Sequence, residues 1–501
     1  MVTQSSLVRR PDLKDRLDSY IWNSLSHDSY RTLELEPSAL VSANRLDVLA
    51  RLAYLETHGY DREFAEGIYF ETIRAQSDGA FKDPHDPSRR AFPDWVSNFR
   101  NLAEGVGNGF RHDGPLVPLA RDGSILNGAH RVAIALFRGL KVPVVETELA
   151  PITADWNYLK TRGVSENHLL HMLYLFCKNA PDVFVAIFWP IAEKLGINPG
   201  MLETNDRKLA GHLRLTGSLQ MVKNVAFEAY KEMNWIGTPA DNFRGLDAKL
   251  ALSAGNVLHD QSVIVSVFQE KKGLSEVREV KNQLRMCDHG STRSVHITDN
   301  PEETMRLASL FFRPSGQDFL RLANPFAHDT RENLSALREK ARKGRVGTDS
   351  FIVDGSTVLG LFGLREPRDL DVLCIETGAA NQLGVEKRNE QLKYHEEPLQ
   401  KLIRSPRFHF ELDGLRIVSL DQVGRMKGNR QEGKDLEDLA LIGEVKAGIS
   451  SQFSPSALAK IRLFRVRLFK AARNTVRKLL RPVGLDGRAK DMYDRYFSRS
   501  P

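Results

Sequence analysis

Cysteine is scarce in this chain of 501 residues, with Cys177, Cys287 and Cys374 as its three members. They lie far apart and lack the close spacing of zinc ligands, so the sequence predicts a reducing compartment and no zinc site. Long apolar runs are also missing. No segment reaches membrane-spanning length, and the first residues, MVTQSSLVRRPDLKDRL, lack the apolar core of a signal peptide. We therefore expect a cytoplasmic protein.

Excess positive charge is absent from most of the chain, although the net charge is +7. Residues 451–501 hold thirteen Lys and Arg against three Asp, a balance of +10, so residues 1–450 sum to −3. A uniformly basic nucleic-acid-binding body is therefore disfavoured, and we do not expect nucleic acid as a partner.

The basic tail combines its cations with apolar residues at helical spacing over 458–481. Cations beside exposed aromatic rings bind anionic headgroups, so this segment predicts a peripheral membrane contact and a membrane-associated fraction of the protein. Packing of the narrow apolar stripe on the preceding domain is an equally open alternative. Binding of nucleic acid by the tail is a third.

Repeats and low-complexity tracts are absent, and 41% hydrophobic with 27% charged residues is typical of a globular chain with several domains. Apolar runs such as DVFVAIFWP and SVIVSVF alternate with helical patterns at 168–177 and 274–286, which indicates an α/β (α+β) multidomain fold. We predict an N-terminal segment (1–31), a mixed domain (32–155), a central α/β domain (156–325), a third mixed domain (326–450) and a basic amphipathic helical tail (451–501).

The stretch GSTVLGLFGLREPRDLDVL (355–373) contains the most informative motif. Gly355 and Ser356 begin a helical run, and the unpaired amides at a helix start favour an anion such as phosphate. Asp369 and Asp371 are expected on the next strand, where alternation places both carboxylates on one face. Two adjacent carboxylates repel unless a divalent cation lies between them, so the pair predicts a Mg²⁺ (or Mn²⁺) site. A glycine turn followed by a chance acidic strand end is the alternative.

The pattern GS(x12)DLD resembles the nucleotidyltransferase (polymerase-β-like) superfamily, and GLRIVSLDQVGRMKGNRQEGKDLEDLALI (414–442) resembles the helical C-terminal part of its small bacterial members. The resemblance implies an NTP, ATP included, as substrate and Mg²⁺ as cofactor. We expect Arg365, Lys427 and Lys434 to contact the phosphates. For the two lysines, a solvated helix face beside Asp435 and Asp438 is the alternative.

The superfamily usually adds a third carboxylate on a neighbouring strand. In FHFELDG (408–414), Glu411 and Asp413 alternate with apolar residues, and we expect Glu411 to be the third catalytic and metal-binding acid. Asp413 with Gly414 also fits a hairpin turn. Without a third acid, the domain would bind a nucleotide and not turn it over.

A second glycine motif lies in PLVPLARDGSILNGAHRVAIALFRGLKVPVV (115–145). Two short strands lead to Gly128, after which an amphipathic helix is expected. Glycine permits close approach of the backbone to a ligand, and His130 and Arg131 can donate charge-assisted hydrogen bonds to phosphate oxygens. A helix cap with a surface arginine is the alternative.

This stretch resembles the ParB/sulfiredoxin superfamily, whose Gly-x-His-Arg box binds nucleotide phosphates, and RTLELEPSALVSANRLDVLA (31–50) resembles its first strand. Sulfiredoxins need a cysteine where this chain has Ala129, which excludes that chemistry. Segregation proteins of this superfamily continue into a helix-turn-helix, where an α/β block is expected here. A small-molecule kinase is the nearest remaining member, with Asp47 or a nearby acid as base.

A lesser motif, HGSTRSVHITDNPEE (289–303), offers Arg293, Ser294 and His296 for phosphate, or simply an ordinary loop and strand. Taken together, the motifs predict a Mg²⁺-dependent nucleotidyltransferase, paired with a kinase or phosphate-binding domain, that acts on a sugar or alcohol phosphate for surface-polysaccharide synthesis. A nucleotide-sensing regulatory protein of antitoxin-like or partition-like type, with little turnover, is the alternative.

Overall fold

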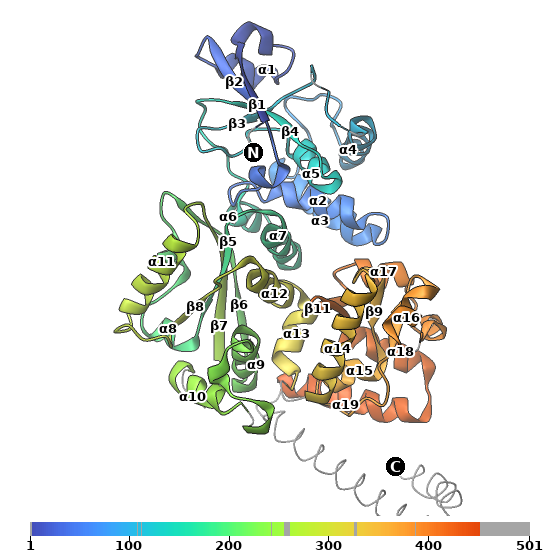
Figure 1. Cartoon of the computed structure of the whole chain (residues 1–501). Helices are drawn as coiled ribbons and strands as arrows, with labels where there is room; N and C mark the ends of the chain where they lie inside the picture. Colours follow the sequence, from blue (N-terminus) through green and yellow to red (C-terminus); the bar gives the residue numbers. More distant parts are fainter. Residues whose placement is uncertain are drawn as a thin grey trace, which may run out of the picture. The chain divides into compact units, whose positions relative to one another are not determined.

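The computed structural model describes residues 3–107, 109–111, 113–241, 243–254, 261–324, 328–385 and 387–450. The tail 451–501, with its predicted membrane contact at 458–481, lies outside these residues. The described chain is a mixed α/β fold, as predicted, and it contains three four-stranded sheets (Figure 1). Within the described ranges, no helix has the length and apolarity to cross a membrane.

The chain divides into two compact units rather than into the five predicted segments. Unit 1 comprises Met1–Thr216, Lys249–Gln317 and Arg404–Arg407, and unit 2 comprises Gly217–Ala248, Asp318–Ile403 and Phe408–Pro501. The boundaries pass through the helices α10 (Arg244–Ser253) and α13 (Pro314–Leu322).

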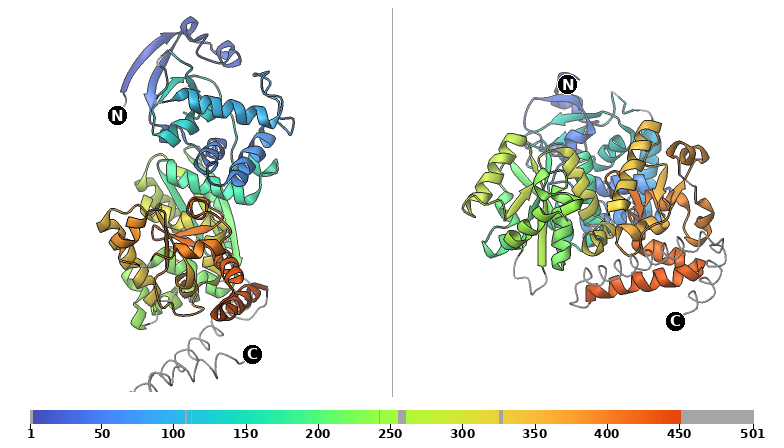
Figure 2. Two further views of the ribbon diagram at one scale, coloured as in Figure 1. Left: turned by 90° about the vertical axis from the view of Figure 1, so that its right-hand side faces the viewer. Right: turned by 60° about the horizontal axis from the view of Figure 1, so that its bottom comes forward.

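The first sheet of unit 1 has the strand order β1-β2-β4-β3. Its strands are β1 (Thr3–Arg9), β2 (Ser29–Leu35), β3 (Val117–Leu119) and β4 (Val142–Glu146). The helices of this region are α1 (Ser19–Ser24), α2 (Asp47–Thr57), α3 (Arg62–Gln76), α4 (Phe92–Val106) and α5 (Ala129–Arg138). β1 pairs antiparallel with β2, and the two strands lie side by side in Figure 2. The predicted boundary at residue 31 is therefore wrong, because residues 3–31 belong to this sheet and its core.

The second sheet of unit 1 has the order β6-β7-β5-β8. Its strands are β5 (Val183–Phe188), β6 (Arg207–Gly217), β7 (Gln261–Glu270) and β8 (Val295–Ile297). The helices around it are α6 (Trp156–Thr161), α7 (Glu166–Asn179), α8 (Pro190–Lys194), α11 (Leu274–Met286) and α12 (Pro301–Phe311). The predicted helices at 168–177 and 274–286 are confirmed as α7 and α11.

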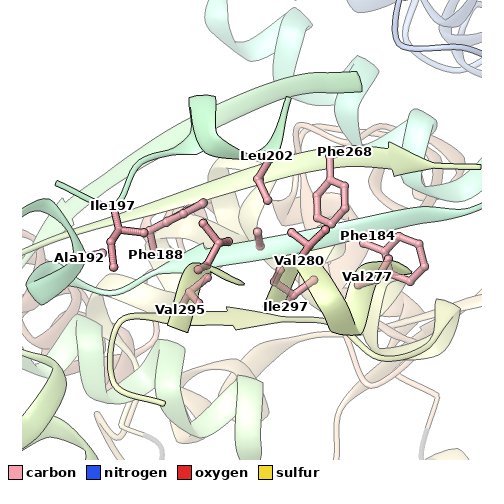
Figure 3. Packing of buried hydrophobic residues seen from close by; sticks show 12 residues of the cluster. Phe184, Phe188, Ala192, Ile197, Leu202, Phe268, Val277, Val280, Val295 and Ile297 are labelled. Carbon is pink, nitrogen blue, oxygen red and sulfur yellow. The ribbon is translucent and has the colours of Figure 1, made fainter. Parts of the chain in front are cut away.

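Strand β5 is buried along its whole length, which explains its unbroken apolar sequence VFVAIF. On one face, Phe184 and Phe188 pack with Phe268 of β7 and with Val277 and Val280 of α11. Figure 3 shows these side chains meeting between the strands and the helix. This cluster is the apolar core that holds the second sheet to α11.

Unit 2 contains the third sheet, with the order β10-β9-β12-β11. Its strands are β9 (Phe351–Val353), β10 (Val372–Cys374), β11 (His409–Leu412) and β12 (Leu415–Val418). The helices of this region are α9 (Leu219–Tyr230), α14 (His328–Gly344), α15 (Gly355–Leu361), α16 (Thr377–Leu383), α17 (Leu399–Arg404), α18 (Leu420–Arg430) and α19 (Gly433–Ser450). β9 pairs antiparallel with β10 and parallel with β12.

Helix α9 belongs to unit 2, although the sequence placed it in the central domain. The Asn224 side chain donates hydrogen bonds to the carbonyls of Leu320 and Ala323 at 2.9 and 2.7 Å. The buried carboxylate of Glu228 forms an ion pair with Arg331 of α14 at 2.7 Å. These buried polar contacts join α9 to the residues 320–323 and to α14 of unit 2.

We expect Phe268→Ala to lower the free energy of unfolding of unit 1 by about 3–5 kcal/mol, because the change leaves a cavity between β7 and α11. Urea unfolding followed by tryptophan fluorescence measures this, since four of the five tryptophans lie in unit 1. The control is Phe137→Ala, whose side chain is 51% exposed. Equal destabilisation by the two changes would contradict the assigned core.

Candidate functional site

The residues predicted around the Gly-Ser and Asp-x-Asp motifs meet at one cavity of about 190 Å³ in unit 2. Its lining includes Asp354, Gly355 and Ser356, where β9 stops and α15 begins, together with Met426, Lys427 and Arg430 of α18. Figure 1 shows α15 and α18 in unit 2. Seven predicted residues line it: Gly355, Ser356, Arg365, Asp369, Asp371, Lys427 and Lys434. Sequence reasoning missed seven others: Asp354, Arg368, Arg388, Gln391, Met426, Arg430 and Glu432.

The start of α15 is shaped around the carboxylate of Asp371. Gly355 has a φ of +63°, and a Cβ there would lie 2.5 Å from Asp371 Oδ2, so only glycine fits without strain. The amide and hydroxyl of Ser356 both donate to Asp371 Oδ2, at 3.2 and 3.1 Å. The anion held by these donors is therefore the Asp371 carboxylate, at the position where the sequence predicted a phosphate.

The two aspartates precede β10 instead of lying within it, which corrects the predicted strand position. They nevertheless face a common cation. Arg388 Nε lies 3.3 Å from Asp371 Oδ1, and Arg388 Nη2 lies 3.7 Å from Asp369 Oδ2. One guanidinium thus offsets the repulsion for which the sequence predicted a metal ion.

Glu411 does not join the aspartates. Val372, Val353 and Ile417 are aligned in one row across the sheet. Glu411 pairs with Arg416 in the adjacent row, on the side of that row away from Asp371. β11 and β10 are the two edges of the sheet, so three strand spacings of about 4.8 Å put them roughly 14 Å apart. The prediction that Glu411 completes the metal site is therefore not supported by the structure.

Asp413, the other predicted acid, occupies the hairpin turn between β11 and β12. Asp413 and Gly414 have φ values of +52° and +80°, as the turn interpretation required. The Asp413 carboxylate pairs with Lys231 of unit 2. Both acids of the FHFELDG motif thus lie away from the cavity.

Asp354, immediately before Gly355, is an acid of the cavity that the sequence reasoning overlooked. Its side chain is 2% exposed, and one oxygen, Oδ2, lies 2.9 Å from Nε2 of the buried His395. Its amide donates to the carbonyl of Asp371 at 3.0 Å, which continues the β9–β10 ladder by one row. Within the described residues, the other oxygen, Oδ1, has no hydrogen-bond partner.

Lys427 is buried and ion-paired. It therefore matches neither prediction completely, because it is neither a free phosphate ligand nor a solvated residue on a helix face. It lines the cavity, but its ammonium lies 3.1 Å from Asp435 and 2.7 Å from Asp438. Burial opposes ionisation of Asp435, but Arg430 and Lys427 outweigh it and lower the pKa of that carboxyl to about 2. Lys434, by contrast, is half exposed and pairs with Glu432 at 3.2 Å.

The cavity lining mixes six cations with four carboxylates. Asp435 and Asp438 lie behind the lining and offset part of the positive charge. A lining of mixed sign suits a cation together with a polyanion better than it suits either alone. In the described part of the chain, no three His, Cys, Asp or Glu side chains are already grouped as a metal site.

A second cavity of about 390 Å³ adjoins the first, and the two share Arg368 and Asp369. Its lining includes Thr330, Asn333 and Lys340 from α14. Unit 2 therefore offers room for two small molecules on either side of Asp369.

The second motif, in unit 1, forms the expected turn and helix. Gly128 has a φ of +91°, and a Cβ there would lie 2.8 Å from Val117, so the motif requires glycine for steric reasons. His130 Nε2 accepts a hydrogen bond from Arg51 at 3.2 Å and lies 2.8 Å from the Tyr69 hydroxyl. Burial and the nearby arginines lower the pKa of His130 well below its usual value, so the imidazole is neutral.

Arg131 also has a structural contact, because its guanidinium donates to the carbonyl of Leu116 at 2.9 Å. A neutral His130 brings no positive charge to a phosphate, which leaves Arg131 and the first amides of α5 as donors. Phosphate binding by Gly128, His130 and Arg131 therefore stays a prediction, with the charge-assisted part assigned to Arg131 alone.

Asp47 is unsuited to the role of base that the kinase resemblance suggested. Both of its oxygens bind Arg45, at 2.8 and 3.0 Å, and Oδ2 also lies 3.2 Å from Arg51. Burial opposes ionisation, but the two arginines outweigh it and lower the pKa of Asp47 to about 2. A carboxylate with this pKa does not accept a proton at neutral pH, and the prediction is corrected to a structural role.

The lesser motif at 289–303 is likewise structural. Arg293 forms a bidentate pair with Asp288, and His296 Nε2 lies 2.9 Å from Glu303 Oε1 inside the protein. Ser294 is fully buried. These residues stabilise the turn and strand β8, and the phosphate interpretation is not supported.

We expect Asp47→Asn to destabilise unit 1 by about 3 kcal/mol at neutral pH, because it leaves two buried arginines without their partner. The pKa of Asp47 is lower in the folded state, so its stabilisation is full above about pH 4 and is lost as the pH falls toward 2. Urea unfolding at pH 7 and pH 3 measures the difference. The surface variant Asp12→Asn is the control, and a pH-independent difference would contradict the assignment.

Comparison with known proteins adds no family to these observations. No family model, no curated protein and no solved structure matches the chain. The residues and geometry of the cavity in unit 2 are therefore the basis on which its function is inferred.

Proposed function

We propose that unit 2 is a Mg²⁺-dependent nucleotidyltransferase that joins NMP from an NTP to a small sugar or alcohol phosphate. An oxygen of the acceptor attacks the α-phosphorus, and pyrophosphate leaves as the bond from that phosphorus to the bridging oxygen breaks. The product is a nucleotide-activated building block of the kind that surface-polysaccharide synthesis uses. The assignment to surface-polysaccharide synthesis is inferred by analogy with the superfamily that the sequence resembles.

The observation that carries the proposal is the convergence of Gly355, Ser356, Asp369 and Asp371 with arginine and lysine side chains on one cavity. Carboxylate oxygens are the ligands that Mg²⁺ prefers, and Asp369 and Asp371 would hold the ion. When bound, Mg²⁺ would neutralise negative charge on the phosphates. Arg368 and Lys434, which line the cavity, would contact the phosphate oxygens.

The adjoining cavity supports a second substrate. It shares Asp369 and Arg368 with the first cavity, so a molecule bound there would lie next to the reacting phosphate. Thr330 and Asn333 offer hydrogen-bonding groups for hydroxyls, and Lys340 offers a charge for a phosphate. These groups favour a hydroxylated, anionic acceptor over an apolar one.

One observation favours the alternative, a nucleotide sensor with little turnover. Arg388 already binds both aspartates and so competes with a metal ion for them. If this contact persists in the presence of Mg²⁺, the cavity would bind a nucleotide without transferring it. Nucleotide binding in the absence of pyrophosphate release distinguishes the sensor from the enzyme.

We expect Asp371→Asn to lower pyrophosphate release at least about 100-fold, a loss of the size seen when one group that stabilises transition-state charge is removed. The fold should remain intact, since the change removes one of several repelling carboxylates. The assay offers each of the four NTPs with Mg²⁺ against a panel of sugar and alcohol phosphates.

The matched control is Glu411→Gln, which removes a carboxylate at the far edge of the same sheet. Its activity should equal that of the wild type. Unchanged pyrophosphate release in Asp371→Asn would refute the metal site at these aspartates.

A further inference from the structure

We propose that Asp354 is a third carboxylate ligand of the divalent cation in this cavity, in the place that the sequence assigned to Glu411. The inference rests on the proposed function, because it concerns the same cavity. It adds a ligand between β9 and α15 that the Asp-x-Asp motif does not contain.

The strand register places Asp354 opposite Asp371. Val353 pairs with Val372, and the next hydrogen bond joins the Asp354 amide to the Asp371 carbonyl. Directly opposed residues of antiparallel strands point to one face, with Cβ atoms about 5 Å apart. A single ion between the two side chains can therefore bind both carboxylates.

The burial of Asp354 points to a missing partner. Its side chain is 2% exposed and lines the cavity, and Oδ1 has no hydrogen-bond partner within the described residues. A buried carboxylate oxygen without a hydrogen-bond donor costs about 1–3 kcal/mol or more of folding free energy. Binding of a ligand to that oxygen would recover this free energy. A divalent cation supplies that ligand.

The residues behind Asp354 fix its orientation. His395 lies 2.9 Å from Oδ2, and the Gln422 amide of α18 lies 3.3 Å from His395 Nδ1 and donates to the His395 carbonyl at 2.8 Å. His395 and Gln422 are buried. These contacts hold Oδ2 on His395 and leave Oδ1 as the oxygen available to a ligand, in the way that supporting residues orient metal ligands.

Binding of the ion requires that it replace Arg388 as the partner of the two aspartates. Asp369 and Asp371 contact Arg388, and no three-carboxylate group is already formed among the described residues. Asp354 is not part of that ion pair. The ion therefore gains the Asp354 oxygen without competition and replaces Arg388 at the two aspartates.

The test is Mn²⁺ binding to the full-length protein, measured by electron paramagnetic resonance without nucleotide or acceptor. We expect Asp354→Asn to weaken Mn²⁺ binding at least about tenfold. Asp371→Asn should weaken it comparably, and Glu411→Gln should leave it unchanged. Thermal unfolding of each variant reports whether the fold is retained.

Asp354→Cys provides a readout that a purely structural role would not change. A thiolate prefers soft ions, so this variant should bind Cd²⁺ more tightly than the wild type does while losing Mn²⁺. A retained Mn²⁺ affinity in Asp354→Asn, alongside a lost affinity in Asp371→Asn, overturns the inference. Absence of Mn²⁺ binding in the wild type overturns it as well.

Failure of the proposed function looks different. If the wild type binds Mn²⁺ through Asp354 but releases no pyrophosphate with any NTP and acceptor, the metal site stands and the transfer reaction does not. If the wild type releases pyrophosphate and Asp354→Asn binds Mn²⁺ as the wild type does, the transfer reaction stands and the role of Asp354 as a metal ligand does not.

Discussion

Repulsion between carboxylates at one end of a small sheet is the constraint on which unit 2 depends. Asp354, just after β9, stands opposite Asp371, just before β10, and Asp369 lines the same cavity. Like charges this close destabilise a fold unless donors or cations lie among them. Ser356 of α15 supplies part of that compensation, and Arg388 and His395, at the two ends of the short helical turn 389–394, supply the rest. The local fold is therefore built to tolerate concentrated negative charge at this point.

The helices α18 and α19 contribute a second set of ion pairs behind the cavity lining. Lys427 and Arg430 of α18 pair with Asp435 and Asp438 of α19, and Arg365 also pairs with Asp438. Isolated buried charges would each cost several kcal/mol, so the ions persist because they are matched and hydrogen-bonded. This network ties the two helices to the loop that carries the aspartates, and it holds Lys427 and Arg430 at the cavity wall. Positioning of cations near the site is thus a consequence of packing.

Local patterns predicted what depends on neighbours in sequence. The helix after Gly355, the turn at Asp413 and the helices α7 and α11 follow from glycine, spacing and periodicity. Strand β6 was missed because RKLAGHLRLTG has no clean alternation of apolar residues. The choice of Glu411 failed because strand order and register decide which acids lie close together, and the sequence of one strand determines neither. Asp354 was overlooked although it adjoins Gly355, since its burial and its contact with His395 arise only in the folded chain.

Asp47 and Asp371, which both pair with arginine, show how a structural carboxylate differs from one suited to bind a ligand. Asp47 is fully buried, has both oxygens bound by Arg45, and is not among the residues lining either cavity. Asp371 lines a cavity and meets Arg388 through one nitrogen at 3.3 Å, a looser contact than the bidentate pair at Asp47. Both aspartates are candidates for chemistry in the sequence because each belongs to a region that resembles a nucleotide-binding superfamily with a glycine at a helix start. What separates them is that Asp354 and Asp371 line a cavity, and Asp354 Oδ1 has no hydrogen-bond partner within the described residues, whereas both oxygens of Asp47 are bound by Arg45. The proposed metal ion therefore belongs beside Asp354 and Asp371 rather than beside Asp47.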